Sequence, residues 1–136
     1  MIVMSDLAKK DTSELIEYLL KSDTGIILPK PFERDIYLFD TFVAGTSYID
    51  GIEAIGLNLK EGDRLVFYRE PNNPHDPQAI RIETLDKIKI GYVPRRDNVV
   101  FSRLMDAGKV LFAKIVKKET ENTWLKITIQ IFLHES

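Results

Sequence analysis

From residue 36 to the end of the chain, short segments rich in β-branched and aromatic residues alternate with segments rich in Gly, Pro, Asn and Asp. The first group favours extended strands and the second favours turns. The final segment alternates most regularly, which places every second residue on one buried face: Leu125, Ile127, Ile129, Ile131 and Leu133. We expect strands at residues 36–44, 52–59, 64–68, 79–84, 88–93, 109–118 and 124–133. This succession predicts a mainly β fold, either a small antiparallel barrel or a sandwich.

One helix is expected inside this series of strands. The pair Asp97–Asn98 can cap a helix that runs to about Asp106, because apolar residues recur there at helical spacing. Gly108 fits the carboxyl end of that helix.

A second helix is expected before the strands. Asp11 can act as its N-cap, and Glu14 stands where a capping box needs its partner. The chain therefore divides into an N-terminal helical extension and linker at residues 1–34 and a β-barrel domain at residues 35–136.

Composition excludes several classes of protein and site. The chain has 136 residues and is 44% hydrophobic, enough for one domain with a core and too apolar for disorder. It has no cysteine, which excludes disulfides, thiolate zinc sites and cysteine nucleophiles. No apolar run has the length of a membrane span, and the first residues lack the pattern of a signal peptide. We therefore expect a cytoplasmic protein.

Charge is unevenly distributed along the chain. The net charge is −2, which argues against indiscriminate nucleic-acid binding. Residues 88–118, however, contain eight Lys or Arg and two Asp, whereas residues 1–87 contain ten Lys or Arg and sixteen Asp or Glu. The asymmetry predicts one positive surface region, unless folding mixes these cations with acidic neighbours. Both outcomes are compatible with the sequence.

The segment from Arg69 to Ile80 is the most unusual stretch of the chain. It lies between two expected strands and holds three prolines, with Asn73, His75 and Asp76 close together. Proline stiffens a loop, and Asn and Asp bond back to nearby amides. The segment therefore predicts a stiff loop that presents polar groups.

Catalytic and metal sites have weak support. His75 and His134 are the only histidines, and no spacing supplies three or four metal ligands. Ser47 could approach His75, but no oxyanion hole or nucleophile elbow is evident, and there is no phosphate-binding loop. We expect no enzymatic activity, no metal and no cofactor; a small hydrolase that uses His75 and Asp76 is a minor alternative.

Nucleic-acid binding fits the residue types better. A single strand is held by aromatic faces under its bases and by cations at its phosphates. Tyr48, His75 and Tyr92 are planar groups at expected strand ends, beside glycine or proline. Alternation places Tyr92 on the face of its strand shared with Ile88 and Ile90, with Lys89 opposite. The arginines that could contact phosphate are Arg95, Arg96 and Arg103.

Three motifs in order resemble the HIRAN domain family. They are a Gly-x-x-Tyr-x-x-Gly segment at residues 45–51, the loop at residues 69–80, and Ile-Gly-Tyr-Val-Pro-Arg at residues 90–95. Their spacing fits the family across residues 35–118. The resemblance favours an OB-like barrel over the other β architectures.

The resemblance also implies a function and its residues. HIRAN domains bind single-stranded DNA with a preference for a free 3′ end, and they serve helicase-like enzymes in the repair and remodelling of stalled replication forks. By this resemblance Tyr48 stacks on a base, and Asn73 and Asp76 form a polar pair around the terminal nucleotide. His75 takes the place of a second stacking residue, and Tyr92 and Arg95 take the places of residues that contact bases or phosphates. Asp76 would accept a hydrogen bond from a 3′-hydroxyl and repel a phosphate.

Two positions depart from the family. Ser47 stands where eukaryotic members have Arg, and Ile49 stands where they have a second Tyr. A missing stacking contact would weaken DNA binding by roughly 1–3 kcal/mol. A protein-interaction module, in which the barrel groove and the N-terminal helix receive a partner such as a helicase, is the alternative.

Overall fold

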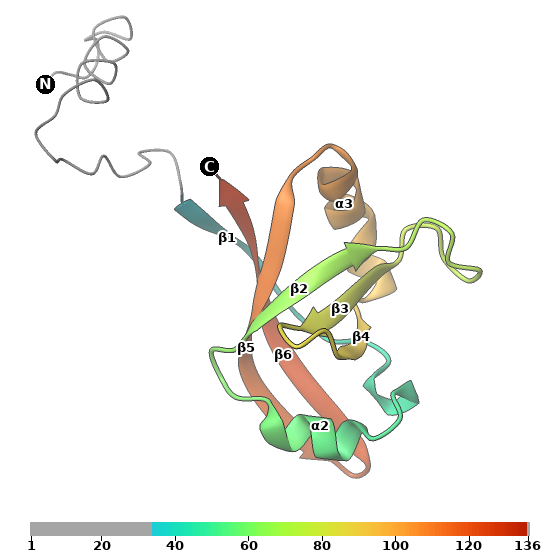
Figure 1. The fold of residues 1–136 in the computed structure, drawn as a ribbon, viewed down its shortest axis with the longest axis vertical. Helices are drawn as coiled ribbons and strands as arrows, with labels where there is room; N and C mark the ends of the chain where they lie inside the picture. Colours follow the sequence, from blue (N-terminus) through green and yellow to red (C-terminus); the bar gives the residue numbers. More distant parts are fainter. Residues whose placement is uncertain (1–33, 136) are drawn as a thin grey trace, which may run out of the picture. The chain divides into compact units, whose positions relative to one another are not determined.

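The computed structural model describes residues 34–135, which form one antiparallel sheet of six strands with two α-helices (Figure 1). The sheet order is β1-β6-β5-β2-β3-β4. The strands are β1 (Arg34–Phe42), β2 (Arg64–Arg69), β3 (Ile80–Thr84), β4 (Lys89–Tyr92), β5 (Val110–Glu121) and β6 (Trp124–Glu135). The expected mainly β, OB-like architecture is confirmed. The N-terminal helix expected at residues 11–21 lies outside the described residues.

The sheet curls until its first and last strands meet. Just after β1, Ala44 forms an isolated bridge with Tyr92 of β4. The Ala44 amide donates to the Tyr92 carbonyl at 2.7 Å, and the Tyr92 amide donates to the Ala44 carbonyl at 2.9 Å. Gly91 permits this approach, because a Cβ at that position would lie 2.4 Å from the Ala44 carbonyl oxygen. The bridge brings the residues after β1 beside the end of β4.

The core lies inside the curled sheet. Alternation in β6 is as expected: Ile127, Ile129 and Ile131 are fully buried, and Leu125 and Leu133 are partly buried against the same core. Each fully buried aliphatic side chain contributes about 1.5–3 kcal/mol relative to its exposure. The other fully buried large apolar residues are Leu65, Ile80, Ile82, Ile90 and Val43.

One expected strand is a helix. Residues 52–59 were expected to be extended, but α2 spans Ile52–Asn58. Ile52, Ile55 and Leu59 have the spacing of one helical face, and that face packs on the core. Gly56 lets α2 approach β6, since a Cβ there would lie 2.6 Å from Leu125 Cδ2.

The inserted helix begins earlier than expected. α3 spans Arg95–Asp106 and its N-cap position is Pro94, not Asp97 or Asn98. Those two side chains instead bond to other elements: Asp97 accepts from Thr41 Oγ1 at 2.7 Å, and Asn98 donates to the loop after β2. Gly108 has φ +93° and follows the helix as expected.

In β5 the side chains of Leu111, Ala113 and Ile115 lie in the core, whereas Val110 is 55% exposed. One expected side-chain orientation, that of Tyr92, is wrong. In β4 the register shifts between Ile82 and Glu83 of the paired strand. This irregularity places Tyr92 beside Lys89, with the Lys89 ammonium 4.5 Å from the ring centroid, rather than on the face of buried Ile90. Among the described residues, no helix combines the length and apolar character that crossing a membrane requires.

Candidate functional site

The loop between β2 and β3 is braced by Asn73. Its Oδ1 accepts from the amides of His75 at 2.8 Å and Asp76 at 3.1 Å. Its Nδ2 donates to Glu70 Oε1 at 2.9 Å. Such bonds from Asn to nearby amides are typical of stiff turns. Asn73 therefore fixes the loop in the conformation that presents His75 and Asp76.

Arg69 holds the two ends of this loop together. Its Nη1 donates to the Ala79 carbonyl at 2.9 Å, and its Nε and Nη2 donate to the two carboxylate oxygens of Asp106 at 2.9 and 3.2 Å. This forked contact joins the loop to the last residue of α3. The Asp106 pKa is lowered by the bond from Arg69.

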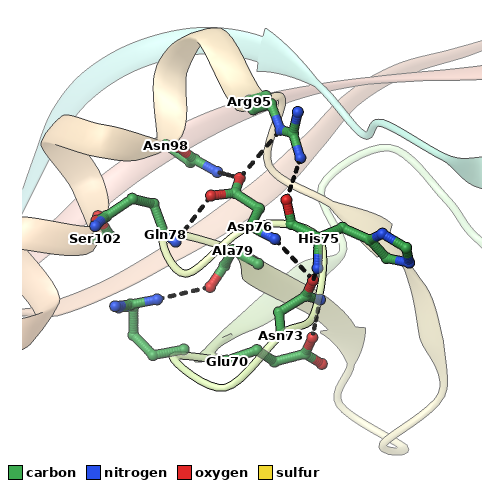
Figure 2. A network of polar contacts seen from close by, with 10 residues as sticks. Glu70, Asn73, His75, Asp76, Gln78, Ala79, Arg95, Asn98 and Ser102 are labelled. Atoms are coloured by element: carbon green, nitrogen blue, oxygen red, sulfur yellow. Dashed lines mark hydrogen bonds and ion pairs between the residues drawn. The ribbon is translucent and has the colours of Figure 1, made fainter.

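The Asp76 carboxylate is held by α3 and by its own loop (Figure 2). Oδ2 accepts from Asn98 Nδ2 at 2.8 Å and lies 3.5 Å from Arg95 Nε. Oδ1 accepts from the Gln78 amide at 2.9 Å. The hydrogen bond from Asn98 is the largest cause that lowers the Asp76 pKa, and the Gln78 amide and Arg95 add to it. The group is therefore a negative charge at neutral pH.

The Arg95 guanidinium contacts the loop, although most of the side chain is exposed. Its Nη2 donates to the His75 carbonyl, yet 70% of its side chain is exposed. The His75 side chain is also exposed, and Figure 2 shows its imidazole pointing away from Asp76. In the described part of the chain, no hydrogen bond joins His75 to Ser47 or to the Asp76 carboxylate.

Tyr92 is oriented by two charged neighbours. Its hydroxyl donates to Glu70 Oε1 at 2.8 Å, and Lys89 Nζ donates to the same hydroxyl at 3.0 Å. Burial raises the Glu70 pKa, but the hydrogen bonds from Asn73, Tyr92 and Arg81 outweigh it, so the pKa lies below its ordinary value.

These groups surround a cleft of about 280 Å³. Its volume is near the lower end for small-ligand pockets. Five of the six site residues expected from the sequence line it, and Asn98 is the polar residue that the sequence did not suggest. The lining residues are Ala44, Gly45, Asn73, His75, Asp76, Ala79, Tyr92, Val93, Arg95 and Asn98.

Tyr48, the sixth expected residue, stands at the edge of the cleft. It lies in the 3₁₀ turn Thr46–Tyr48 and is 89% exposed. A Cβ on the cleft residue Gly45 would lie 3.9 Å from Tyr48 Cδ2. Buried Thr46 anchors the turn, because its Oγ1 donates to the Leu125 carbonyl at 2.8 Å. The ring is therefore an exposed planar surface on a fixed turn.

Several cations of residues 88–118 contact carboxylate or carbonyl groups. Lys117 pairs with Glu119 at 2.6 Å, and Lys118 donates to the Gly56 carbonyl on α2. Arg96 lies 3.6 Å from Asp97. Arg95 alone among the cations lines the cleft. Three of the eight cations, Arg95, Arg96 and Lys117, thus lie within 4.0 Å of a carboxylate.

Metal binding finds no support in residues 34–135, where no three His, Asp or Glu side chains are grouped to hold an ion. The cleft is lined by amide, carboxylate, guanidinium and aromatic side chains.

The family model of the HIRAN domain matches residues 36–136, about three quarters of the chain. The chain belongs to the HIRAN domain family. A sequence relative is the mouse helicase-like transcription factor, with 26% identity over 95 residues, covering 68% of this chain and 9% of that protein. The HIRAN match thus spans less than a tenth of that relative's length.

Two solved structures share the fold of this HIRAN domain. A protein from Lactobacillus plantarum has a TM-score of 0.71 and 27% identity, over 76% of this chain and 99% of that one. The HIRAN domain of human HLTF has a TM-score of 0.60 and 15% identity, over 75% of this chain and 80% of that one. The second likeness is one of fold alone. The family expected from the three motifs is confirmed.

Proposed function

We propose that this HIRAN domain is a non-catalytic module that binds single-stranded DNA and holds its 3′-hydroxyl end in the cleft. The ionised Asp76 carboxylate, held at the cleft wall with 17% of its side chain exposed, carries the proposal. A carboxylate accepts a hydrogen bond from a hydroxyl and repels a phosphate. A free hydroxyl end is therefore favoured over a phosphorylated end or a continuing strand.

Residues at the edge of the cleft supply contacts for the bases and phosphates that precede the terminal nucleotide. Tyr48 offers an exposed ring to a base, and His75 and Tyr92 offer two further planar groups. Arg95, largely exposed beside Asp76, is placed for the phosphate that precedes the terminal nucleoside. The cleft thus combines a group that rejects a terminal phosphate with a cation that attracts the next one.

Family membership supports a proposal about the biological setting. The mouse relative is a helicase-like transcription factor, and we propose that this chain acts where DNA ends are processed, in repair or at stalled replication, with a helicase or another protein as partner. We further propose that residues 35–136 suffice for DNA binding.

The affinity for DNA is expected to be modest. Ser47 and Ile49 lie on either side of Tyr48 and offer no Arg or second Tyr to a bound strand.

A protein-interaction module is the second candidate, favoured by a larger groove beside α2. This groove of about 530 Å³ lies between α2 and the turn after β3. Its rim includes Leu85, 65% exposed, and Ile88, 42% exposed. Exposed apolar groups around a groove are typical of peptide-binding surfaces. A hydrolase that uses His75 and Asp76 has no comparable support, because the imidazole points away from the carboxylate (Figure 2).

Fluorescence anisotropy with a short single strand tests the first candidate. The strand carries a 3′-hydroxyl or a 3′-phosphate, and the protein is wild type or Asp76→Asn, which removes the charge but keeps the shape. We expect wild type to prefer the hydroxyl end and Asp76→Asn to lose most of that preference. If wild type binds neither strand at low salt, the DNA-end function is wrong and the protein-interaction module becomes the leading candidate.

A further inference from the structure

Asn98 is a buried polar residue whose position the fold alone does not explain. It lies on the first turn of α3, is 2% exposed and lines the cleft. Nδ2 donates to Asp76, whereas Oδ1, in the part of the chain that the structure describes, is buried without a hydrogen-bond partner. A buried amide with only one of its two polar atoms hydrogen-bonded stabilises the folded protein less than an apolar side chain of similar size would.

Ser102, one turn along the same helix, provides a contrast. It is fully buried, and its hydroxyl contacts Gln78 Oε1 and the Val99 carbonyl. Ser102 therefore fastens the same loop to the same helix without contacting Asp76. Because this fastening already exists, the contact from Asn98 serves the carboxylate rather than the attachment of the loop.

We propose that Asn98 is a specificity-determining residue of the cleft, which positions the Asp76 carboxylate toward the terminal group of the strand and so sets the preference for a hydroxyl over a phosphate. This inference rests on the proposed DNA-end function. Asn98 acts through Asp76 and is a positioning residue. Its hydrogen bond fixes Oδ2, which leaves Oδ1, bonded only to the Gln78 amide, as the oxygen with accepting capacity for the ligand.

Within residues 34–135, few titratable or charged groups surround this pair. Arg95 of α3 lies 3.5 Å from Asp76, and His75 precedes it in the loop. Glu70 lies across the loop, where it is bonded to Asn73 and Tyr92. Asp97 accepts from Thr41 of β1. Asn98 thus provides the short contact to the carboxylate from α3, and its hydrogen bond is the main reason that the Asp76 pKa is lowered.

Two substitutions separate positioning from folding. Asn98→Leu removes the unsatisfied oxygen, which favours folding, and also the donor to the Asp76 carboxylate, which opposes it, so we expect only a small net change in the free energy of unfolding. We expect a loss of about tenfold in the hydroxyl-to-phosphate preference, roughly the effect of one hydrogen bond to a charged group. Asn98→Asp keeps the shape of the side chain. Near neutral pH its carboxylate repels Asp76, and at lower pH one proton shared by the pair restores a donor.

The experiment measures the affinity for both strand ends between pH 4.5 and 8. The end preference of each variant is divided by that of wild type at the same pH, which removes pH effects that all the proteins share. We expect Asn98→Asp to recover toward wild type as pH falls and Asn98→Leu not to recover. Ser102→Ala is the matched control: stability decreases, and the preference between the two ends is unchanged.

A carbon-13 titration of the Asp76 carboxyl in the free protein adds a readout without DNA. We expect its pKa to rise in Asn98→Leu and to stay unchanged in Ser102→Ala. A wild-type protein that does not distinguish the two ends overturns the DNA-end function and this inference with it. A wild type that does distinguish them, with Asn98→Leu equal to it in preference, overturns this inference alone.

Discussion

The hydroxyl of Tyr92 donates a 2.8 Å hydrogen bond to Oε1 of Glu70, which joins the end of β4 to the beginning of the loop after β2. Asn73 Nδ2 donates to the same oxygen, and Arg81 Nη1 donates to Oε2 at 2.8 Å. One carboxylate therefore fixes a strand, a loop and two residues of the cleft wall. Because these contacts all favour the ionised form, Glu70 links the cleft geometry to pH.

Replacing Glu70 with Gln is expected to lower the free energy of unfolding at pH 7 by about 1–2 kcal/mol, because the ion pair with Arg81 is lost and the remaining hydrogen bonds are made to a neutral group. The folded-state pKa of Glu70 is below its ordinary value of 4.5. Its contribution is therefore fully present above pH 4.5 and is lost as the pH falls through the lower folded-state pKa. Urea unfolding at pH 7, 5, 4 and 3 should show the gap between wild type and Glu70→Gln closing in acid.

Asp86→Asn is the control for that comparison. Asp86 is exposed in the turn after β3, and its carboxylate makes no hydrogen bond or ion pair in residues 34–135. Its substitution should leave the free energy of unfolding within about 0.5 kcal/mol of wild type. A gap for Glu70→Gln that stays constant from pH 7 to pH 3 would contradict the role of the ionised group.

Local sequence patterns were sufficient for most of the fold. Alternation located β6, and turn residues separated the strands, because these signals depend on neighbours in sequence. The prediction of a strand at residues 52–59 was wrong because eight residues with apolar groups at mixed spacing fit either a strand or a helix. The contact that decides for α2, Gly56 against Leu125, joins residues far apart in the chain.

The candidate site was predicted to a similar extent. Motif order placed Asn73, His75, Asp76, Tyr92 and Arg95 together, and the cleft contains all five. The sequence did not indicate Asn98, since it follows Asp97 where an N-cap is expected. The signal that could have found it is its spacing from Phe101 and Ser102, which places a polar residue on the buried face of α3.

Gly91→Ala tests the closure of the sheet. A Cβ there would lie 2.4 Å from the Ala44 carbonyl oxygen and 2.6 Å from Val43 Cγ1, so the bridge between Ala44 and Tyr92 must open. We expect a loss of at least about 2 kcal/mol in the free energy of unfolding, measured by urea denaturation. Gly62→Ala is the control, because its φ of +91° is strained for Ala but nothing lies within 4 Å; about 1 kcal/mol is expected. Equal losses would refute the steric argument.

Tyr48→Ala tests the exposed ring beside the cleft. Because Tyr48 is 89% exposed, its removal should change the free energy of unfolding by less than about 0.5 kcal/mol. Binding of a single strand should weaken by about 1–3 kcal/mol if a base stacks on the ring. Tyr37→Ala is the matched control: this tyrosine on β1 is 51% exposed and packs edge-on against Phe132, away from the cleft residues. If the affinity measured by anisotropy falls equally for both variants, the ring of Tyr48 is not a specific stacking site.

Arg95→Gln tests the phosphate contact at the rim. Removing one phosphate contact should reduce the slope of log K against log salt concentration by about 0.7 and weaken binding equally for all base sequences. Arg96→Gln is the control on the next residue, since Arg96 lies 5.2 Å from the Phe42 ring centroid and does not line the cleft. Affinities measured from 20 to 200 mM salt give both slopes. If Arg96→Gln lowers the slope and Arg95→Gln does not, the strand leaves the cleft on the β1 side of α3, and the assignment of Arg95 to the phosphate is wrong.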